Sequence, residues 1–188
     1  MNDLLILASK SPRRKQLLEL AEIGFEIFIK DTDESYPAEL PISEVPVFIA
    51  MQKARDIHSD FPDRKILAAD TIVVLGKQII GKPKDRADAI QILTRLSGKT
   101  HTVITGVVML DREKVIQFSD TTEVEFHPIP LKDIEYYVDV YNPYDKAGAY
   151  AIQEWIGAIA IKRINGCFYN VMGLPVSKVV QCLAEVIN

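Results

Sequence analysis

The stretch KILAADTIVVL, residues 65–75, constrains the fold of this chain more than any other segment. Its length and its many aliphatic residues predict a long buried strand near the centre of a sheet. Asp70 interrupts the run, and because an unpaired carboxylate in a buried strand is costly, it must be paired, hydrogen-bonded, protonated or bound to a metal. A structural role at a strand end is the alternative. The apolar run continues beyond Asp70, which favours a functional role.

The first turn from strand to helix, within LLILASKSPRRKQLLEL at residues 4–20, gathers serines and arginines. Ser11 is a natural N-cap. A helix N-terminus offers unpaired N–H groups and the positive end of the helix dipole, and Ser9, Arg13 and Arg14 add donors suited to phosphate oxygens. An ordinary helix start with solvated arginines is the alternative. Because arginines in a first turn oppose the dipole unless an anion compensates, the corner indicates a phosphate site.

The other segments alternate between helical and strand patterns. Helices are expected at residues 12–21, 45–57, 85–96, 131–140 and 175–187. Strands are expected at residues 4–8, 25–29, 65–75, 101–111, 114–126 and 157–164, with a hairpin from 65–75 into QIIGKP. Because a purely parallel sheet excludes hairpins, the pattern predicts an α/β fold with a mixed sheet.

Length and charge narrow the function classes. The 188 residues fit a single domain, residues 1–188, that can bury a sizeable core. The net charge of −4 argues against a nucleic-acid polymer or a membrane as partner, but allows a small anion in a local basic pocket. Cys167 and Cys182 match no metal-ligand spacing, and no segment is apolar for long enough to cross a bilayer. The expected location is the cytoplasm.

Three further charged residues could act with Asp70. Glu34 lies in a polar loop, and together with Asp70 it would supply oxygen ligands to a magnesium or manganese ion carried on substrate phosphates. The alternative for Glu34 is a solvated loop acid. Lys82 lies in a stiff glycine–proline corner that would aim its side chain, although an exposed turn lysine is the commoner case. Lys53 falls late in the second predicted helix, where a surface position and a ligand position are equally compatible with the pattern.

Two polar residues could orient a substrate. Gln153 ends YNPYDKAGAYAIQ, residues 141–153, in which glycine permits close backbone approach and the carboxamide can contact a base edge. A loop packed by its own tyrosines is the alternative. Thr71 would face the opposite side of the sheet from Asp70 in a regular strand, and only a break in the strand would turn it towards the same site.

Taken in order, these segments resemble the Maf family of nucleotide pyrophosphatases. Each motif is weak alone, but the ordered set covers essentially the whole chain and is highly specific. The motifs are LASKSPRR at 7–14, DE at 33–34, KA at 53–54, AADTIV at 68–73, GKP at 81–83, LSGKTHTVITGV at 96–107, DKAGAYAIQ at 145–153 and NGCFYNVMGLP at 165–175.

The resemblance implies a fold like that of the inosine triphosphate pyrophosphatases, an elongated mixed α/β structure with a central cleft that is usually dimeric, so a homodimer is expected. It also implies hydrolysis of a nucleoside triphosphate to the monophosphate and pyrophosphate with a divalent cation, Mg or Mn. In the family, the aspartate matched by Asp70 is a general base or a metal-bound acid, and Glu34 matches an acidic residue near the metal. The phosphates are held by the residues matched by Ser9, Arg13, Arg14, Lys53 and Lys82.

One branch of the family acts on dTTP and UTP, and another acts on modified guanine nucleotides. The residues at Arg13, Thr71 and Gln153 are similar to the dTTP/UTP pattern. Two other functions stay open on the sequence. One is a nucleotide-binding regulator of cell division or septum formation without essential turnover. The other is a polynucleotide-binding domain, which the negative charge disfavours.

Overall fold

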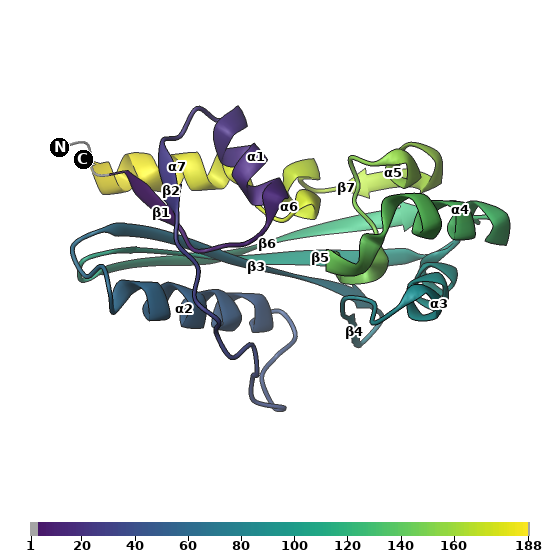
Figure 1. Cartoon of the computed structure of the whole chain (residues 1–188), viewed down its shortest axis with the longest axis horizontal. Helices are drawn as coiled ribbons and strands as arrows, with labels where there is room; N and C mark the ends of the chain where they lie inside the picture. Colours follow the sequence, from purple (N-terminus) through teal and green to yellow (C-terminus); the bar gives the residue numbers. More distant parts are fainter. Residues whose placement is uncertain (1–3, 188) are drawn as a thin grey trace. The chain divides into compact units, whose positions relative to one another are not determined.

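The structure is a computed structural model that describes residues 4–187, with side chains described up to residue 184. The described chain packs as two compact units: residues 4–70, 105–120 and 173–187 form the first, and residues 71–104 and 121–172 form the second. The order of elements is shown in Figure 1. It is β1 (Leu5–Leu7), α1 (Pro12–Leu20), β2 (Phe25–Ile27), α2 (Val45–His58), β3 (Lys65–Leu75), β4 (Gln78–Ile80), α3 (Arg86–Leu96), β5 (Thr100–Asp111), β6 (Lys114–Phe126), α4 (Leu131–Tyr141), η1 (Pro143–Asp145), η2 (Ala147–Ala149), α5 (Trp155–Ala160), β7 (Ile161–Asn165), α6 (Phe168–Met172) and α7 (Val176–Ile187).

The strands form one sheet in the order β2-β1-β3-β5-β6-β7, with β4 paired to β3 outside this path. Strand β1 is parallel to both of its neighbours. In this register Ile6 lies opposite Glu26 of β2 and Ile66 of β3. Strand β4 is antiparallel to β3, and β7 is antiparallel to β6. The sheet is therefore mixed, and the predicted α/β fold class is confirmed.

In the first unit, helix α2 covers one face of the sheet, and α1 and α7 lie on the other (Figure 1). Gly106 of β5 lets the start of α2 approach the strand closely, because a Cβ at this position would lie 2.2 Å from the backbone nitrogen of Val47. The core on the α2 side is built from alternate strand residues and one stripe of the helix, namely Ile6, Ala8, Ala50, Ala54, Ile57, Ile66, Ala68, Val108 and Leu110.

In the second unit, a core of aliphatic side chains from α3, α4, α5 and the strands surrounds an aromatic cluster. The rings of His101, Phe126 and Tyr150 contact one another edge to face, with centroids 4.8 to 5.4 Å apart. Nε2 of His101 lies 2.8 Å from the hydroxyl of Tyr150. Burial lowers the pKa of His101 to about 4 and raises the pKa of the Tyr150 hydroxyl above its usual range. Both groups are therefore neutral near pH 7.

The strand predicted over residues 157–164 is wrong in its first half. Residues up to Ala160 belong to helix α5, and only Ile161–Asn165 forms strand β7. The reason is the burial pattern: Ile156, Gly157 and Ala160 are buried while residues 158 and 159 are exposed, which is helical rather than alternating spacing. The other predicted helices and strands are confirmed to within a few residues at their ends.

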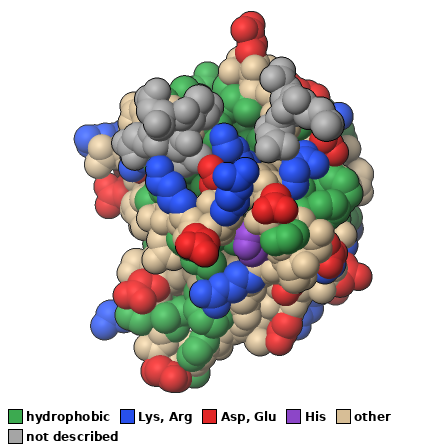
Figure 2. Space-filling view, turned by 90° about the vertical axis from the view of Figure 1, so that its left-hand side faces the viewer, with side chains coloured by type: hydrophobic (Ala, Val, Ile, Leu, Met, Phe, Trp, Pro, Cys, Tyr) green, Lys and Arg blue, Asp and Glu red, His purple; other side chains and the backbone are tan. Residues whose placement is uncertain are grey.

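Charged side chains of both signs are spread over the surface. On the face shown in Figure 2, Lys and Arg side chains are interspersed with Asp and Glu among the residues drawn in colour. Within residues 4–187, no helix is long and apolar enough to span a membrane.

Candidate active site

Asp70 lies on β3 in the first unit, on the sheet face that α2 covers. Successive strand residues point to opposite faces, so Asp70 shares its face with Ile66 and Ala68, which pack against α2. Its side chain is 15% exposed. A carboxylate this well buried requires a partner, and α2 is the element placed to supply one.

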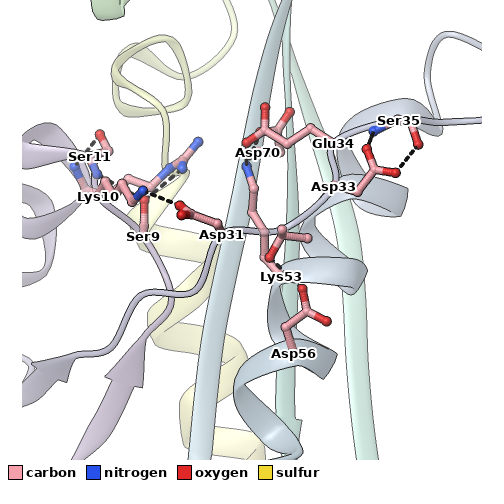
Figure 3. A network of polar contacts seen from close by, with 12 residues as sticks. Ser9, Lys10, Ser11, Asp31, Asp33, Glu34, Ser35, Lys53, Asp56 and Asp70 are labelled. Atoms are coloured by element: carbon pink, nitrogen blue, oxygen red, sulfur yellow. Dashed lines mark hydrogen bonds and ion pairs between the residues drawn. The ribbon is translucent and has the colours of Figure 1, made fainter.

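Lys53 of α2 is that partner, and it contacts a second carboxylate as well. Its Nζ donates to Oδ1 of Asp70 at 2.8 Å and lies 2.7 Å from Oε1 of Glu34. In Figure 3 the lysine side chain rises along α2 and ends between the two acids. Lys53 is 18% exposed, whereas Glu34 is 52% exposed. One ammonium group therefore holds a partly buried strand acid and an exposed loop acid together.

The loop that carries Glu34 is attached to its surroundings on both sides. The hydroxyl of Thr32 donates to Oδ2 of Asp56 on α2 at 2.6 Å. Nζ of Lys10 donates to Oδ1 of Asp31 at 2.7 Å, which ties the loop to the segment before α1 (Figure 3). These contacts explain how an acid in a loop without regular structure comes to lie beside Asp70.

The corner before α1 is built around a buried arginine. Ser11 caps the helix, because its Oγ accepts from the backbone nitrogen of Arg14 at 3.4 Å. Nε of Arg14 donates to the carbonyl of Gly173 at 2.8 Å, and Nη1 donates to Oγ of Ser9 at 3.0 Å. Both Ser9 and Arg14 are buried. Arg14 thus links the first turn of α1 to the start of the segment that leads into α7.

Electrostatics connect this corner to the acids. Burial lowers the pKa of the Arg14 guanidinium, and the negative charge of Asp70 is the largest effect that opposes it. Arg13 adds to the lowering and Glu34 opposes it. The first unit contains six of the predicted site residues: Ser9, Arg13, Arg14, Glu34, Lys53 and Asp70. The charged ones among them interact, so this unit contains a mixed cluster of acidic and basic groups.

The other three predicted residues, Thr71, Lys82 and Gln153, belong to the second unit. Strand β3 is regular through Asp70 and Thr71, so the two side chains leave it on opposite faces. Lys82 and Gln153 are both exposed, in segments without regular structure. Whether these three residues bind substrate stays a prediction.

The donor set of the first unit fits a divalent cation only in a limited way. Among residues 4–187, no group of three or more His, Cys, Asp or Glu side chains could hold a metal ion. Asp70 and Glu34 nevertheless hold a cation, the ammonium of Lys53, between their oxygens. Magnesium is commonly bound by one or two carboxylates together with substrate phosphates. Two carboxylates at this position match that pattern in residue type and number.

Sequence reasoning missed a second polar cluster, in the second unit. Lys146 is buried beside Asp145 and Glu154, and the hydroxyl of Tyr137 on α4 also contacts Glu154. The one signal in the sequence was the presence of two charges, at Lys146 and Glu154, on either side of a run of small and apolar residues.

Two solved structures share the fold. A HAM1 protein from Coxiella burnetii has a TM-score of 0.54 and 15% identity, covering 96% of this chain and 98% of that one. The Ham1 protein of Staphylococcus aureus has a TM-score of 0.53 and 14% identity, covering 98% and 99%. The mixed sheet and these likenesses define an α/β protein of the Ham1 fold class.

The sequence places the chain more narrowly. It matches the family described as Maf-like protein over residues 4–186 and belongs to that family, which confirms the resemblance of its ordered motifs. A dTTP/UTP pyrophosphatase from Cytophaga hutchinsonii is 50% identical over 184 residues, 98% of this chain and 84% of the relative. The dTTP/UTP pyrophosphatase of Bacteroides thetaiotaomicron is 46% identical over 93% of this chain and 91% of the relative.

Proposed function

We propose that this chain is a nucleoside triphosphate pyrophosphatase that hydrolyses dTTP and UTP to the monophosphate and pyrophosphate. The observation that carries the proposal is the contact of Lys53 with both Glu34 and Asp70 in the first unit. The names of the relatives support the same substrates. Opposite charges packed this closely suit a substrate that brings both phosphates and a cation.

Cleavage of the anhydride between the α- and β-phosphates needs a positioned water, a base and neutralisation of the charge that develops on the leaving pyrophosphate. Asp70 is the proposed base, because its carboxylate is only 15% exposed and its Oδ1 becomes available for a proton once Lys53, its partner in this structure, moves to the phosphates. Proton removal from the attacking water is the kind of step that contributes about 10²-fold to 10⁴-fold in rate.

The phosphates require cationic partners, and the first unit supplies them. Lys53 is the proposed phosphate ligand that exchanges its carboxylate partners for phosphate oxygens when substrate binds. Arg13 and the N-terminal turn of α1 are proposed to hold the remaining phosphate charge, with buried Ser9 and Arg14 shaping that turn. Lys82 stays a proposed phosphate ligand on the basis of the sequence alone.

Glu34 and Asp70 are the residues that would hold a magnesium or manganese ion. When bound there, the cation would neutralise phosphate charge and polarise the anhydride. In this proposal Asp70 also orients the attacking water, and Lys53 binds the phosphates. The proposed contacts to the nucleobase of the substrate are Arg13, Thr71 and Gln153.

Pyrophosphate release from a panel of nucleoside triphosphates with Mg²⁺ or Mn²⁺ tests the proposal. The wild-type chain should release pyrophosphate fastest from dTTP and UTP, and Asp70→Ala should lower the rate by about 10²-fold or more. Asp139→Asn is the matched control, because Asp139 pairs with Arg86 in an exposed ion pair.

Binding of nucleotides without turnover would overturn the proposal in favour of a regulatory nucleotide-binding protein. Release confined to guanine nucleotides would retain the reaction and overturn the substrate assignment. The homodimer and the cytoplasmic location stay predictions from the sequence, and light scattering on the purified chain checks the first.

A further inference from the structure

One buried hydroxyl in the second unit holds the chain on both sides of Gln153. The side chain of Tyr137, on α4, is fully buried. Its hydroxyl accepts a hydrogen bond from the backbone nitrogen of Ala151 at 3.2 Å and donates one to Oε2 of Glu154. These partners lie two residues before and one residue after Gln153, so a single group on a helix restrains the segment that presents the carboxamide.

A buried lysine, Lys146, also contacts Glu154. Nζ of Lys146 lies 2.9 Å from Oδ1 of Asp145 and 3.5 Å from Oε1 of Glu154. Glu154 therefore uses one oxygen for Tyr137 and the other for Lys146. Because both charges are largely buried, loss of either would leave the other without its partner in a region of low dielectric. The chain from 145 to 154 is thereby tied to α4.

The same segment is also fixed against the turn that carries Lys82. The backbone nitrogen of Gly148 donates to the carbonyl of Gly81 at 3.1 Å. Just beyond Gln153, the indole of Trp155 packs edge to face on Tyr136 of α4, with centroids 5.0 Å apart. Gln153 itself is exposed. Because little packs around its side chain, the backbone that carries it sets where the carboxamide lies.

We propose that Tyr137, Glu154 and Lys146 are positioning residues that set nucleotide selectivity by holding Gln153 in place. The inference rests on the proposed function, because it assumes that Gln153 contacts the base. None of the three residues has a task in the proposed cleavage step. Loss of this network should therefore change which base is preferred while leaving the cleavage step itself almost intact.

Tyr137→Phe is the variant that tests the inference, because it removes the hydroxyl and keeps the ring. The measured quantity is the ratio of kcat/KM for dTTP to kcat/KM for dCTP. We expect this ratio to fall by about fivefold to tenfold, the scale of one lost hydrogen bond, mainly through a higher KM for dTTP. Tyr141→Phe is the matched control, since Tyr141 lies one turn further along α4, stacks on Tyr137 and should leave the ratio unchanged.

A double-variant cycle separates positioning from general loosening of the fold. If Tyr137 acts through Gln153, the ratio for Tyr137→Phe with Gln153→Ala should equal that for Gln153→Ala alone. Independent, additive losses would overturn the inference, and so would an unchanged ratio in Tyr137→Phe. If Tyr137→Phe does not fold, Glu154→Gln takes its place in the cycle, where equal ratios would support the inference and additive losses would overturn it.

The fluorescence of Trp155, the sole tryptophan of the chain, gives a second readout. In Tyr137→Phe the indole should become more accessible to iodide than in Tyr141→Phe, and equal quenching in the two variants would contradict the inference. A wild-type chain that releases no pyrophosphate from any nucleotide would overturn the proposed function instead. An active wild type whose Tyr137→Phe variant keeps its selectivity would overturn only the positioning role.

Discussion

The backbone nitrogen of Gly148 donates a hydrogen bond to the carbonyl oxygen of Gly81, with 3.1 Å between the two atoms. This bond joins the turn before Lys82 to the turn before Gln153, although the two segments lie far apart in the sequence. Gly148 has a φ of 71°, and a Cβ at this position would lie 3.0 Å from the side chain of Val73. The position therefore requires glycine both for its backbone conformation and for the space around it.

Gly148→Ala should lower the free energy of unfolding by about 2 kcal/mol, because it combines an unfavourable φ with a contact to Val73. Gly76→Ala is the matched control, since Gly76 has a φ of 63° but open space around its Cβ position. The control should cost about 1 kcal/mol, from the backbone alone. Urea denaturation of both variants measures the difference, and equal losses would contradict the role of Val73.

Arg14→Gln should lower the free energy of unfolding by about 2 kcal/mol. The substitution removes the buried bonds to the carbonyl of Gly173 and to Oγ of Ser9, and hydrogen bonds from a charged donor contribute more than neutral ones. Arg86→Gln breaks an exposed ion pair and should change stability much less. Thermal unfolding followed by circular dichroism compares the two, and similar shifts in Tm would argue against the structural role of Arg14.

Stability should fall as the pH drops from about 6.5 to about 4, because His101 is buried in its neutral form. Burial lowers the pKa of His101 to about 4 in the folded chain, whereas an unfolded histidine titrates near 6.5. Between these values the unfolded chain binds a proton that the folded chain does not, so acid favours unfolding. Over this whole pH range the free energy of unfolding should fall by on the order of 3 kcal/mol.

Urea denaturation at a series of pH values checks this prediction. His101→Gln should remove most of the dependence on pH in this window. The control is His127→Gln, which replaces an exposed histidine and should retain the wild-type profile. A His101→Gln profile as steep as that of the wild type would show that other groups cause the acid sensitivity.

Lys53→Met should abolish efficient turnover and yet strengthen the binding of Mn²⁺ in the absence of nucleotide. The ammonium of Lys53 occupies the space between the carboxylates of Glu34 and Asp70, so its removal frees both for a metal. An increase in affinity of about tenfold or more is expected from removal of a competing charge at this distance. Calorimetric titration with Mn²⁺ measures it, with Lys10→Met, from the exposed pair with Asp31, as the control. Unchanged Mn²⁺ affinity in Lys53→Met would contradict the proposed metal ligands.

Local signals in the sequence were sufficient for most of the fold. The apolar run around Asp70 forms the predicted long strand, and Ser11 caps α1 as its residue type indicates. Short helix α5 was predicted as part of a strand because six residues rich in Ile, Ala and Gly make too few turns for their periodicity to be recognised. Its helical burial becomes evident only once the surrounding core is known.

The site was harder to predict because its geometry depends on contacts between distant segments. Residue types alone made Glu34, Lys53 and Asp70 candidates, but their shared contact depends on a loop that Thr32 and Asp56 fix to α2. No local pattern indicates such a bond. The role of the Tyr137 hydroxyl could not be predicted either, because a tyrosine in an amphipathic helix is ordinarily a core residue.

The position of Lys53 also bears on the order in which substrate and metal arrive. With the lysine in place, the two carboxylates and the ammonium carry a single net negative charge, and a free divalent ion must break two ion pairs before it can enter. A cation that arrives already bound to a triphosphate brings new anionic partners for the displaced lysine. If Glu34 and Asp70 hold the metal as proposed, the resting site would discriminate against the bare ion, and the nucleotide–metal complex is the form in which both would enter.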